Sequence, residues 1–188
     1  MNMAQNNKLR KKGLRLEGEK IYLIPLRTSH VGPTYLAWLR DKEVNQFLEA
    51  RFTHYTLASL KKYVSRLSRD QNNLLLAIIL KGENRFIGTI KLGFIDWNHS
   101  RGDIGIMIGD KSCWGKGYAT EAIKLLTNYA FDKLRFHKIT AGAYDINKGS
   151  IKAFLKLGFY KECHQKEHCI YGRRYIGHVL LAKINEKA

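Results

Sequence analysis

The sequence predicts a mixed α/β domain, an α+β arrangement with a mostly antiparallel central sheet and helices on both of its faces. Strand and helix signals alternate along the 188 residues without long linkers, repeats or low-complexity tracts. A continuous apolar run at 74–80 and a strict alternation at 104–108 are typical of strands, whereas 119–133 repeats its apolar side chains at helical spacing. The 45% apolar content is enough for one buried core.

The first thirteen residues are expected to stand apart from this domain. Residues 1–13 are polar and basic, lack the apolar region of a signal peptide, and are predicted to form a disordered arm. A single domain is then expected over residues 14–188. No apolar run reaches the length of a membrane span, and three cysteines without a CxxC pair favour a reducing compartment. We therefore expect a cytoplasmic protein with no membrane partner.

The first half of the domain is predicted to contain three strands and two helices. Thr56 is expected to cap the second helix, which places Leu57, Leu60, Val64 and Leu67 on one face. Residues 81–84 are typical of a hairpin turn between the second and third strands. The expected ranges are Ile21–Leu26, Leu74–Leu80 and Arg85–Phe94 for the strands, Val31–Arg40 for the first helix, and a start after Thr56 for the second.

The second half is predicted to alternate four strands with two helices. In the strand 104–108 the three isoleucines face one way, and Gly105 and Met107 face the other. The helix at about 119–133 carries an apolar stripe made of Ala119, Ala122, Ile123, Leu126 and Ala130. The other expected ranges are Lys138–Tyr144, Phe159–Cys163 and Tyr175–Ile184 for strands, and Lys148–Leu157 for a helix that ends at Gly158.

The loop before the long helix, residues 114–120 (WGKGYAT), has the composition of an anion-binding site. Gly115 and Gly117 allow a positive φ and a close approach of the backbone to a ligand. The helix that follows offers unpaired N–H groups and the positive end of its dipole, and Lys116 adds a positive charge. A pyrophosphate would suit this site. The GxG pair alone is a weak signal, because the loop is neither a P-loop nor GxGxxG.

The strong positive charge is a second indication of anionic ligands. Lysine and arginine number 33 against 16 aspartates and glutamates, for a net charge of +17. Such a surface attracts polyanions and speeds their capture. The candidates are nucleic acid, the ribosome, a phosphate-bearing cofactor or a nucleotide-linked substrate, beside an ordinary solvated basic surface. Charge alone does not choose among them.

One short tract carries zinc-ligand residue types. Cys163 and His164 are neighbours, as are His168 and Cys169, and no second ligand pair lies elsewhere at finger-like spacing. Structural zinc sites usually draw their ligands from two separated knuckles. We therefore expect no metal, and a strand-edge segment with surface histidines instead.

Two separated motifs carry a resemblance to a known family. The segment 103–122, DIGIMIGDKSCWGKGYATEA, resembles the acetyl-CoA-binding core of the GNAT superfamily, nearest to the branch of ribosomal-protein N-terminal acetyltransferases. Its [QR]xxGx[GA] pattern falls on 114–119, where Gly117 and Ala119 match and Trp114 replaces Gln or Arg. Further matches are Asn147, Ser150, Leu157-Gly158-Phe159, Ile24–Arg27 and Trp38–Val44. The likeness runs from about residue 16 to 184.

The resemblance implies a GNAT fold and an acyltransferase that moves an acetyl group from acetyl-CoA directly to a primary amine. It implies that strand 104–108 is splayed by a bulge, so that its peptide groups pair with the pantetheine arm. The N–H of Met107 or of a neighbour would hold the thioester oxygen. Cofactor binding is thereby assigned to Ile106, Met107, Ile108, Trp114, Gly115, Lys116, Gly117, Tyr118, Ala119, Thr120 and Asn147.

Three residues are candidates for proton transfer under this resemblance. Ser150 matches the position of the acid, with helix capping as its structural alternative and Tyr144 and Tyr160 as reserves. Asp103 stands where the branch usually has Glu, so we expect a base that acts through water, or else an ion pair with Arg101. Glu49 is the second candidate for the base. Cys113 has no histidine near it in sequence and is not expected to be a nucleophile.

The acceptor amine is the least determined part of the prediction. Residues 45–55, NQFLEARFTHY, resemble GNAT members associated with surface-polysaccharide sugars, and Arg51, His54 and Lys61 would meet the pyrophosphate of a nucleotide-linked amino sugar. A protein α-amine is the alternative, and polyamines are disfavoured because their sites concentrate carboxylates. A basic nucleic-acid-binding module with a degenerate core is a second alternative, although no RRM, KH or helix-turn-helix signature is present. We expect no nucleic acid substrate. An exposed edge at Tyr175–Ile184 would suit a homodimer.

Overall fold

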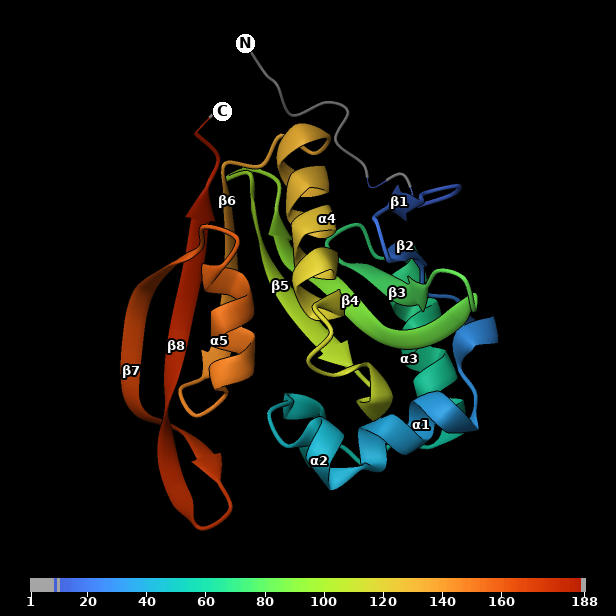
Figure 1. Ribbon diagram of the computed structural model, residues 1–188, viewed down its shortest axis with the longest axis horizontal. Coiled ribbons are helices and arrows are strands. Elements are labelled where there is room, and N and C mark those ends of the chain that lie inside the picture. The colour runs from blue at the N-terminus through green and yellow to red at the C-terminus, as the bar shows by residue number, and fades with distance from the viewer. Residues whose placement is uncertain (1–8, 10, 187–188) are drawn as a thin grey trace.

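The computed structural model describes residue 9 and residues 11–186, and an eight-stranded sheet runs through this part of the chain (Figure 1). Its strands are β1 (Leu16–Glu17), β2 (Ile21–Pro25), β3 (Leu74–Leu80), β4 (Arg85–Asp96), β5 (Arg101–Ile108), β6 (Lys138–Tyr144), β7 (Tyr160–Tyr171) and β8 (Arg174–Ile184). They lie in the order β1-β2-β3-β4-β5-β6-β8-β7, and every pair is antiparallel except β5 with β6. The predicted mixed, mostly antiparallel architecture is confirmed.

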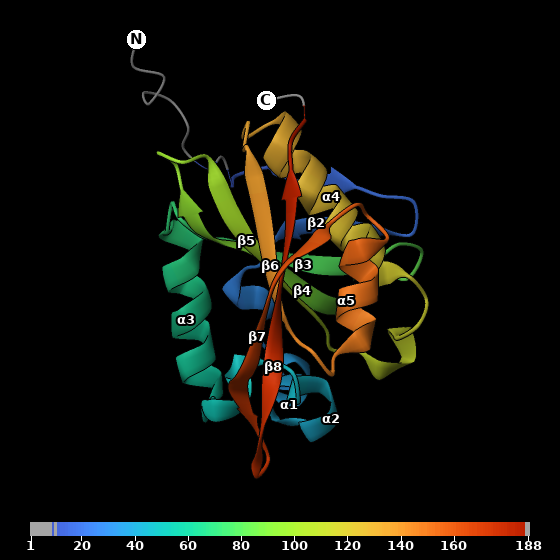
Figure 2. The same cartoon turned by 90° about the vertical axis from the view of Figure 1, so that its left-hand side faces the viewer.

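Helices cover both faces of the sheet. They are α1 (Pro33–Arg40), α2 (Lys42–Asn45), α3 (Leu57–Arg69), α4 (Tyr118–Asp132) and α5 (Lys148–Leu155), with 3₁₀ turns η1 (Thr28–His30), η2 (Glu49–Phe52) and η3 (Lys111–Cys113). Figure 2 shows α3 on one side of the sheet and α4 and α5 on the other. Each side has its own apolar core: Leu126 and Phe154 belong to the core under α4 and α5, and Leu60 and Val64 to the one under α3.

Two helix ends are marked by residues that can be recognised in the sequence, a capping threonine and a glycine. Thr56 caps α3, since its hydroxyl accepts from the N–H of Ser59 at 3.1 Å and the Ser59 hydroxyl accepts from the N–H of Thr56 at 2.9 Å. Such a cap stabilises a helix by about 1 kcal/mol. The last turn of α5 gives way to Gly158, whose φ of +79° is left-handed. The cap at Thr56 is confirmed, whereas α5 ends at Leu155, two residues before the expected Leu157.

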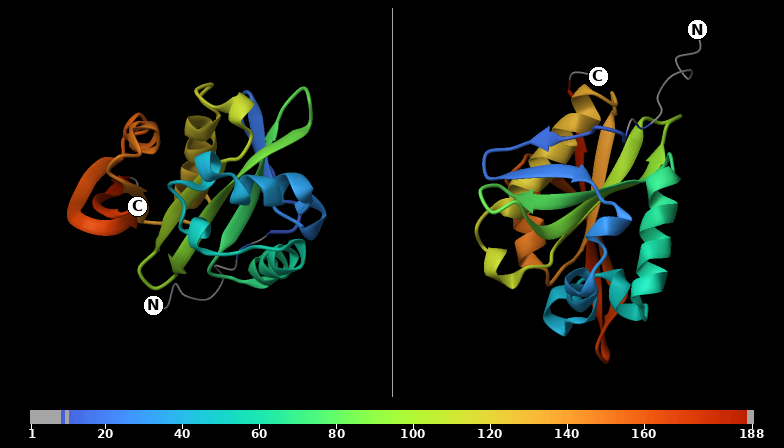
Figure 3. Two further views of the ribbon diagram at one scale, coloured as in Figure 1. Left: turned by 90° about the horizontal axis from the view of Figure 1, so that it is seen from below. Right: turned by 90° about the vertical axis from the view of Figure 1, so that its right-hand side faces the viewer.

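The feature that positions the site is the divergence of β5 from β6. The two strands pair only over Arg101–Asp103 with Lys138–Thr140, and beyond this point β5 is paired with β4 alone. Seen from below, the β7–β8 hairpin and α5 lie to one side of this divergence, with α4, β4 and β5 to the other (Figure 3). The predicted splay is confirmed, but the bulge lies in β4, between Gly93 and Asp96, rather than in β5.

The largest differences from the expected boundaries lie in β7 and near the N-terminus. β7 does not stop at Cys163 but continues to Tyr171, because pairing with β8 extends a strand whose mostly exposed residues carry no hydrophobic alternation. At the other end, residues 1–8 and 10 of the expected arm lie outside the described residues. Leu9 is buried, and Lys11 Nζ donates to the carbonyl of Leu67 at 2.7 Å, so these two residues pack against α3 and the core.

Candidate functional site

A cleft of about 500 Å³ opens on the α4 side of the sheet, where β5 and β6 diverge. Its walls are the end of β5, the loop and first turn of α4, the helix α5, and the segment 43–48. Of the predicted cofactor residues, those that line the cleft are Ile106, Met107, Ile108, Trp114, Gly115, Gly117, Tyr118, Ala119, Thr120 and Asn147. Lys116 is not among the lining residues. The structure therefore brings two motifs far apart in sequence to one cavity.

The glycine loop adopts the backbone conformation that its composition predicts. Gly115 and Gly117 have φ of +72° and +86°, and a Cβ at either would have no atom within 4 Å. Gly117 precedes α4 without a side-chain cap, and the first helical hydrogen bond runs from the Glu121 N–H to the Gly117 carbonyl at 3.0 Å. Among the described residues, the N–H groups of 118–120 have no partner. This open, donor-lined cradle fits a phosphate group.

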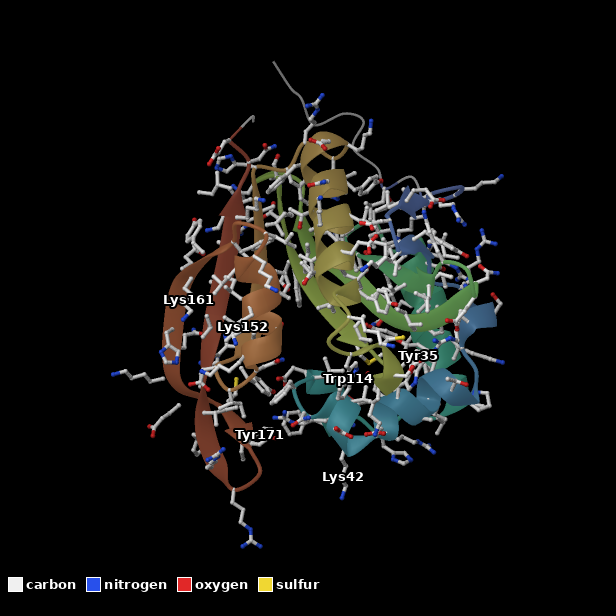
Figure 4. All side chains as sticks on the ribbon, viewed as in Figure 1. Tyr35, Lys42, Trp114, Lys152, Lys161 and Tyr171 are labelled. Atoms are coloured by element: carbon white, nitrogen blue, oxygen red, sulfur yellow. The ribbon has the colours of Figure 1, made fainter. Side chains whose placement is uncertain are left out.

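Trp114, at the position where the superfamily pattern has Gln or Arg, makes a hydrogen bond within the protein. Its indole Nε1 donates to the carbonyl of Ile108 at 2.8 Å, which ties the glycine loop to the end of β5. Lys152, on α5, lies across the cleft from Trp114 (Figure 4). Lys156, which follows the last residue of α5, also lines the cleft. The two lysines were missed in the sequence, although Lys148, Lys152 and Lys156 recur at a spacing of four after Asn147, which places them on one helix face.

The peptide groups of β5 that face the cleft follow from the strand's alternation. The N–H of Gly109 donates to Ile87 of β4 at 2.9 Å, and a Cβ on Gly88 of β4 would meet the Met107 carbonyl oxygen at 2.3 Å. Because successive peptide groups point to opposite edges of a strand, Met107 is directed at β4, and Ile106 and Ile108 at the open side. Of the N–H groups expected to hold the thioester oxygen, that of Met107 is therefore directed at β4, and those of its neighbours Ile106 and Ile108 face the open side.

Asn147 and Ser150 lie together at the start of α5 and both line the cleft. The Ser150 N–H donates to Asn147 Oδ1 at 3.2 Å, so Asn147 is the helix cap. The structural alternative for Ser150, capping by its hydroxyl, is not what the structure shows. Its hydroxyl is available at the wall of the cleft.

The two predicted carboxylates lie on the opposite face of the sheet, outside this cleft. Asp103 Oδ2 accepts from the Thr140 hydroxyl at 2.8 Å, and burial raises the pKa of Asp103. Asp103 does not pair with Arg101, whose guanidinium meets Asp96 at 3.2 Å. Glu49, in η2, accepts a hydrogen bond from the Tyr144 hydroxyl. Burial, and then this hydrogen bond, raise the pKa of Tyr144.

A second, basic groove of about 710 Å³ lies near Glu49, between the segment 39–55 and the turn of the β7–β8 hairpin. Its lining includes Arg40, Lys42, Arg51 and His54, and no aspartate or glutamate. The Arg51 guanidinium lies 4.9 Å from the centre of the Tyr144 ring and donates to the carbonyl of Ile170 in β7. The predicted Lys61 is on α3 and does not line the groove.

The cysteine and histidine residues of the tract 163–169 all lie in β7. His164 Nε2 lies 3.2 Å from Asp145 Oδ2, and the ring of His168 lies 5.6 Å from that of His178. Cys113 is buried in the core under α4 and approaches Arg85 Nη2 at 3.9 Å. Tyr160 is exposed at the start of β7, away from the cleft lining.

Comparison with known proteins identifies what this fold and cleft are similar to. The family model for an acetyltransferase (GNAT) domain matches residues 20–160. The chain is 30% identical over 177 residues to the probable N-acetyltransferase YjcK of Bacillus subtilis (strain 168), covering 90% of this chain and 97% of that protein.

Two solved structures share the fold. Spermidine N-acetyltransferase from Vibrio cholerae, in complex with CoA and spermine, has a TM-score of 0.81 at 19% identity and covers 90% of this chain and 98% of its own. Ribosomal-protein-S5-alanine acetyltransferase from Vibrio fischeri has a TM-score of 0.79 at 21% identity, with coverages of 93% and 98%. None of the helices in the described residues is long and apolar enough to cross a membrane.

Proposed function

The chain belongs to the acetyltransferase (GNAT) domain family, and we propose that it transfers acetyl from acetyl-CoA to an amine whose far end is anionic. The reaction class follows from the family: the chain is an N-acetyltransferase. A nucleotide-linked amino sugar is the acceptor that we would test first. The single observation that carries this choice is the basic groove next to Glu49 and Tyr144, with its cationic lining and no carboxylate.

The cofactor cleft offers the groups that acetyl-CoA requires. When bound, acetyl-CoA supplies a thioester whose carbonyl carbon accepts the amine. The unpartnered N–H groups of 118–120 would hold its pyrophosphate, with Lys152 and Lys156 adding positive charge from α5. The peptide groups of Ile106 and the N–H of Ile108, whose carbonyl already accepts from Trp114, would pair with the pantetheine arm in the manner of an added strand.

Proton transfer is assigned on both sides of the divergence. Ser150 would donate its hydroxyl proton to the departing sulfur, since it is the hydroxyl at the cleft wall beside Asn147. On the opposite face, the exposed Glu49 and the partly buried Asp103 would attract the ammonium group of the acceptor by their negative charge. The shape of the site thus supports an acceptor that enters from the β7–β8 side and meets the thioester between β5 and β6.

The acceptor's anionic end would occupy the basic groove. Arg51 links the two parts, because it lines the groove and also lies over the ring of Tyr144, which donates to Glu49. Phe52, 61% exposed at the groove, is a surface on which a planar base could stack. A polyamine, which carries no anionic end, would give these cations no anionic partner.

The test is an assay of free CoA release with UDP-glucosamine, an alanyl tripeptide and spermidine as acceptors, at low and raised salt. We expect the highest kcat/KM for the nucleotide sugar, with a salt-dependent KM for that acceptor. A preference for spermidine would overturn the proposal for the acceptor. Release with none of the three, in a chain that binds acetyl-CoA, would overturn the assignment of an amine acceptor of these classes.

A protein α-amine is the second candidate. The observation in its favour is the fold shared with an acetyltransferase whose name specifies ribosomal protein S5-alanine. The basic groove would take an acidic stretch after the first residues of such a substrate. The tripeptide is therefore to be compared with a longer peptide that carries glutamates at its fourth and fifth positions.

A further inference from the structure

The face of the sheet opposite α4 is bare where β5 and β6 part. Gly105 of β5 and Gly142 of β6 come two residues after the last paired residues of the two strands, Asp103 and Thr140. Both glycines are exposed, and a Cβ on Gly105 would have no atom within 4 Å. The divergence is thus flanked on this side by two residues without side chains, and the open space over Gly105 leaves room for an acceptor to reach it.

The ring of His178, from β8, overhangs this bare region. A Cβ on Gly142 would lie 2.5 Å from His178 Nε2, so that only a glycine on β6 makes room for the imidazole. The other ring nitrogen, Nδ1, lies 3.1 Å from Gln165 Oε1 on β7. With that oxygen as acceptor, Nδ1 carries the proton and Nε2 keeps its lone pair.

The charged and titratable groups around His178 come from four elements. Asp103 of β5 and Glu49 of η2 act on it as negative charges, His168 of β7 as a positive one when protonated, and Tyr144 is its partner on β6. Burial, and then His168, lower the pKa of His178 below its ordinary value of 6.5, against the opposing effect of the two carboxylates. The imidazole is therefore neutral at pH 7 and stands beside two carboxylates that attract a cation.

We propose that Nε2 of His178 accepts the proton of the acceptor ammonium, with Gln165 holding the imidazole in the tautomer that leaves Nε2 free. This inference rests on the proposed function and adds to it a base that the sequence did not indicate. Asp103 and Glu49 then bind the ammonium group rather than deprotonate it. His178 lies near the divergence, at the strand next to β6, whereas the cofactor motifs lie on the other face.

The proton balance of the transfer is complete with these groups. The ammonium gives one proton to His178 Nε2, and its nitrogen lone pair forms the N–C bond to the thioester carbon. The C–S bond breaks with its electron pair on sulfur, which takes a proton from the Ser150 hydroxyl. The nitrogen releases its second surplus proton, which restores the Ser150 hydroxyl, and His178 gives its own to water. The products are the amide, free CoA and one proton.

The test is the pH dependence of kcat/KM in the full chain, with the acceptor that the CoA-release panel selects. For the wild type we expect kcat/KM to rise to a plateau, with a midpoint below pH 6.5. In His178→Gln we expect a loss of about 100-fold at pH 7, and a kcat/KM that keeps rising with pH as the free amine becomes more abundant. The affinity for acetyl-CoA, measured by calorimetry, should be unchanged.

His164→Gln is the matched control. His164 lies on the same hairpin but pairs with Asp145, away from the bare region, and its profile should follow the wild type. A His178→Gln variant with the wild-type profile and rate would overturn the role of His178 and leave the proposed function standing. A wild-type chain that acetylates no amine would overturn both.

A measurement without any acceptor or cofactor guards against a variant that fails to fold. In the wild-type chain labelled with ¹⁵N and ¹³C on histidine, the imidazole resonances of His178 should titrate with a midpoint below 6.5. At pH 7.5 they should show the tautomer protonated on Nδ1. A ring that carries its proton on Nε2, or that is still protonated at neutral pH, would overturn the proposal.

Discussion

The two faces of the site are built in different ways. On the α4 side, the groups expected to hold the cofactor are mainly backbone: N–H groups of 118–120 and peptide groups of β5, beside two glycines with positive φ. On the β7–β8 side, the groups are side chains from separate elements, Glu49, Asp103 and His178 among them. A ligand common to a whole family suits the first kind of site. The second kind can change its acceptor by single substitutions without a change in the fold.

The largest effect is expected from Gly117→Glu, which would break the cradle on the α4 side. The substitution places a carboxylate where the pyrophosphate would lie, at a backbone position with φ of +86°. We expect acetyl-CoA binding to disappear from calorimetry, with the fold retained. Gly117→Ala separates the two causes, because it adds the backbone strain, about 1–2 kcal/mol, without the charge. Unchanged affinity in the glutamate variant would contradict the cradle.

Calorimetry and thermal unfolding also distinguish the acetyltransferase from a basic nucleic-acid-binding module. For the acetyltransferase we expect acetyl-CoA to raise the Tm of the wild-type chain at both low and raised salt. The Gly117→Glu variant should no longer bind acetyl-CoA. If an oligonucleotide stabilises the chain at low salt only, and acetyl-CoA does not stabilise it at all, the result would favour the nucleic-acid-binding module instead.

The next effect concerns the junction of the two faces. Ser150→Ala should lower kcat by about 100-fold, as the loss of a positioned acid does, with little change in the KM for acetyl-CoA. The helix cap is retained because Asn147 accepts from the Ser150 backbone rather than from its hydroxyl. Steady-state kinetics and a thermal unfolding control measure the two properties. An unaltered kcat would remove Ser150 as the acid.

A smaller effect is expected from the α5 wall. Lys152→Met together with Lys156→Met should raise the Kd for acetyl-CoA by about tenfold at low salt, and by less as salt rises, because exposed charges are screened. Lys148→Met, on the same helix but outside the cleft lining, is the matched control. Equal affinity losses for the control would show that the general positive charge, not the wall, attracts the cofactor.

The smallest effect concerns stability on the β7–β8 side. Burial raises the pKa of Asp103, so the ionised carboxylate destabilises the folded state above that pKa. Asp103→Asn keeps an oxygen for the Thr140 hydroxyl and removes this cost. The variant should therefore have a higher Tm than the wild type at neutral pH, and the gap should close as pH falls through the raised pKa toward the ordinary value of 3.8. A lower Tm at pH 7 would contradict the direction of the shift.

The difference between the two faces also explains what sequence reasoning found and missed. The cofactor side depends on contiguous residues, so the GxG loop, the long helix and the Asn147 signature could be located before the fold was known. The choice between Met107 and its neighbours stayed open, because the pattern does not say which edge of β5 borders the gap. Nothing in the sequence indicated His178, since a lone histidine in a strand belongs to no motif. Nothing in it indicated the extension of β7 either, whose mostly exposed residues show no hydrophobic alternation.

The sequence by itself determined the mixed α/β class, the cap at Thr56, and the positive φ of Gly115 and Gly117 before α4, because each depends on short-range backbone conformation and helical or strand periodicity. Only the tertiary structure decided that β5 pairs with β6 for three residues and then leaves it. That divergence places the α4 cradle and Ser150 on one side of the sheet and Glu49, Asp103 and His178 on the other. The physical reason is that strand pairing joins residues far apart in the chain, such as Asp103 with Thr140 and Tyr144 with His178. No local pattern encodes which of them will face the same opening.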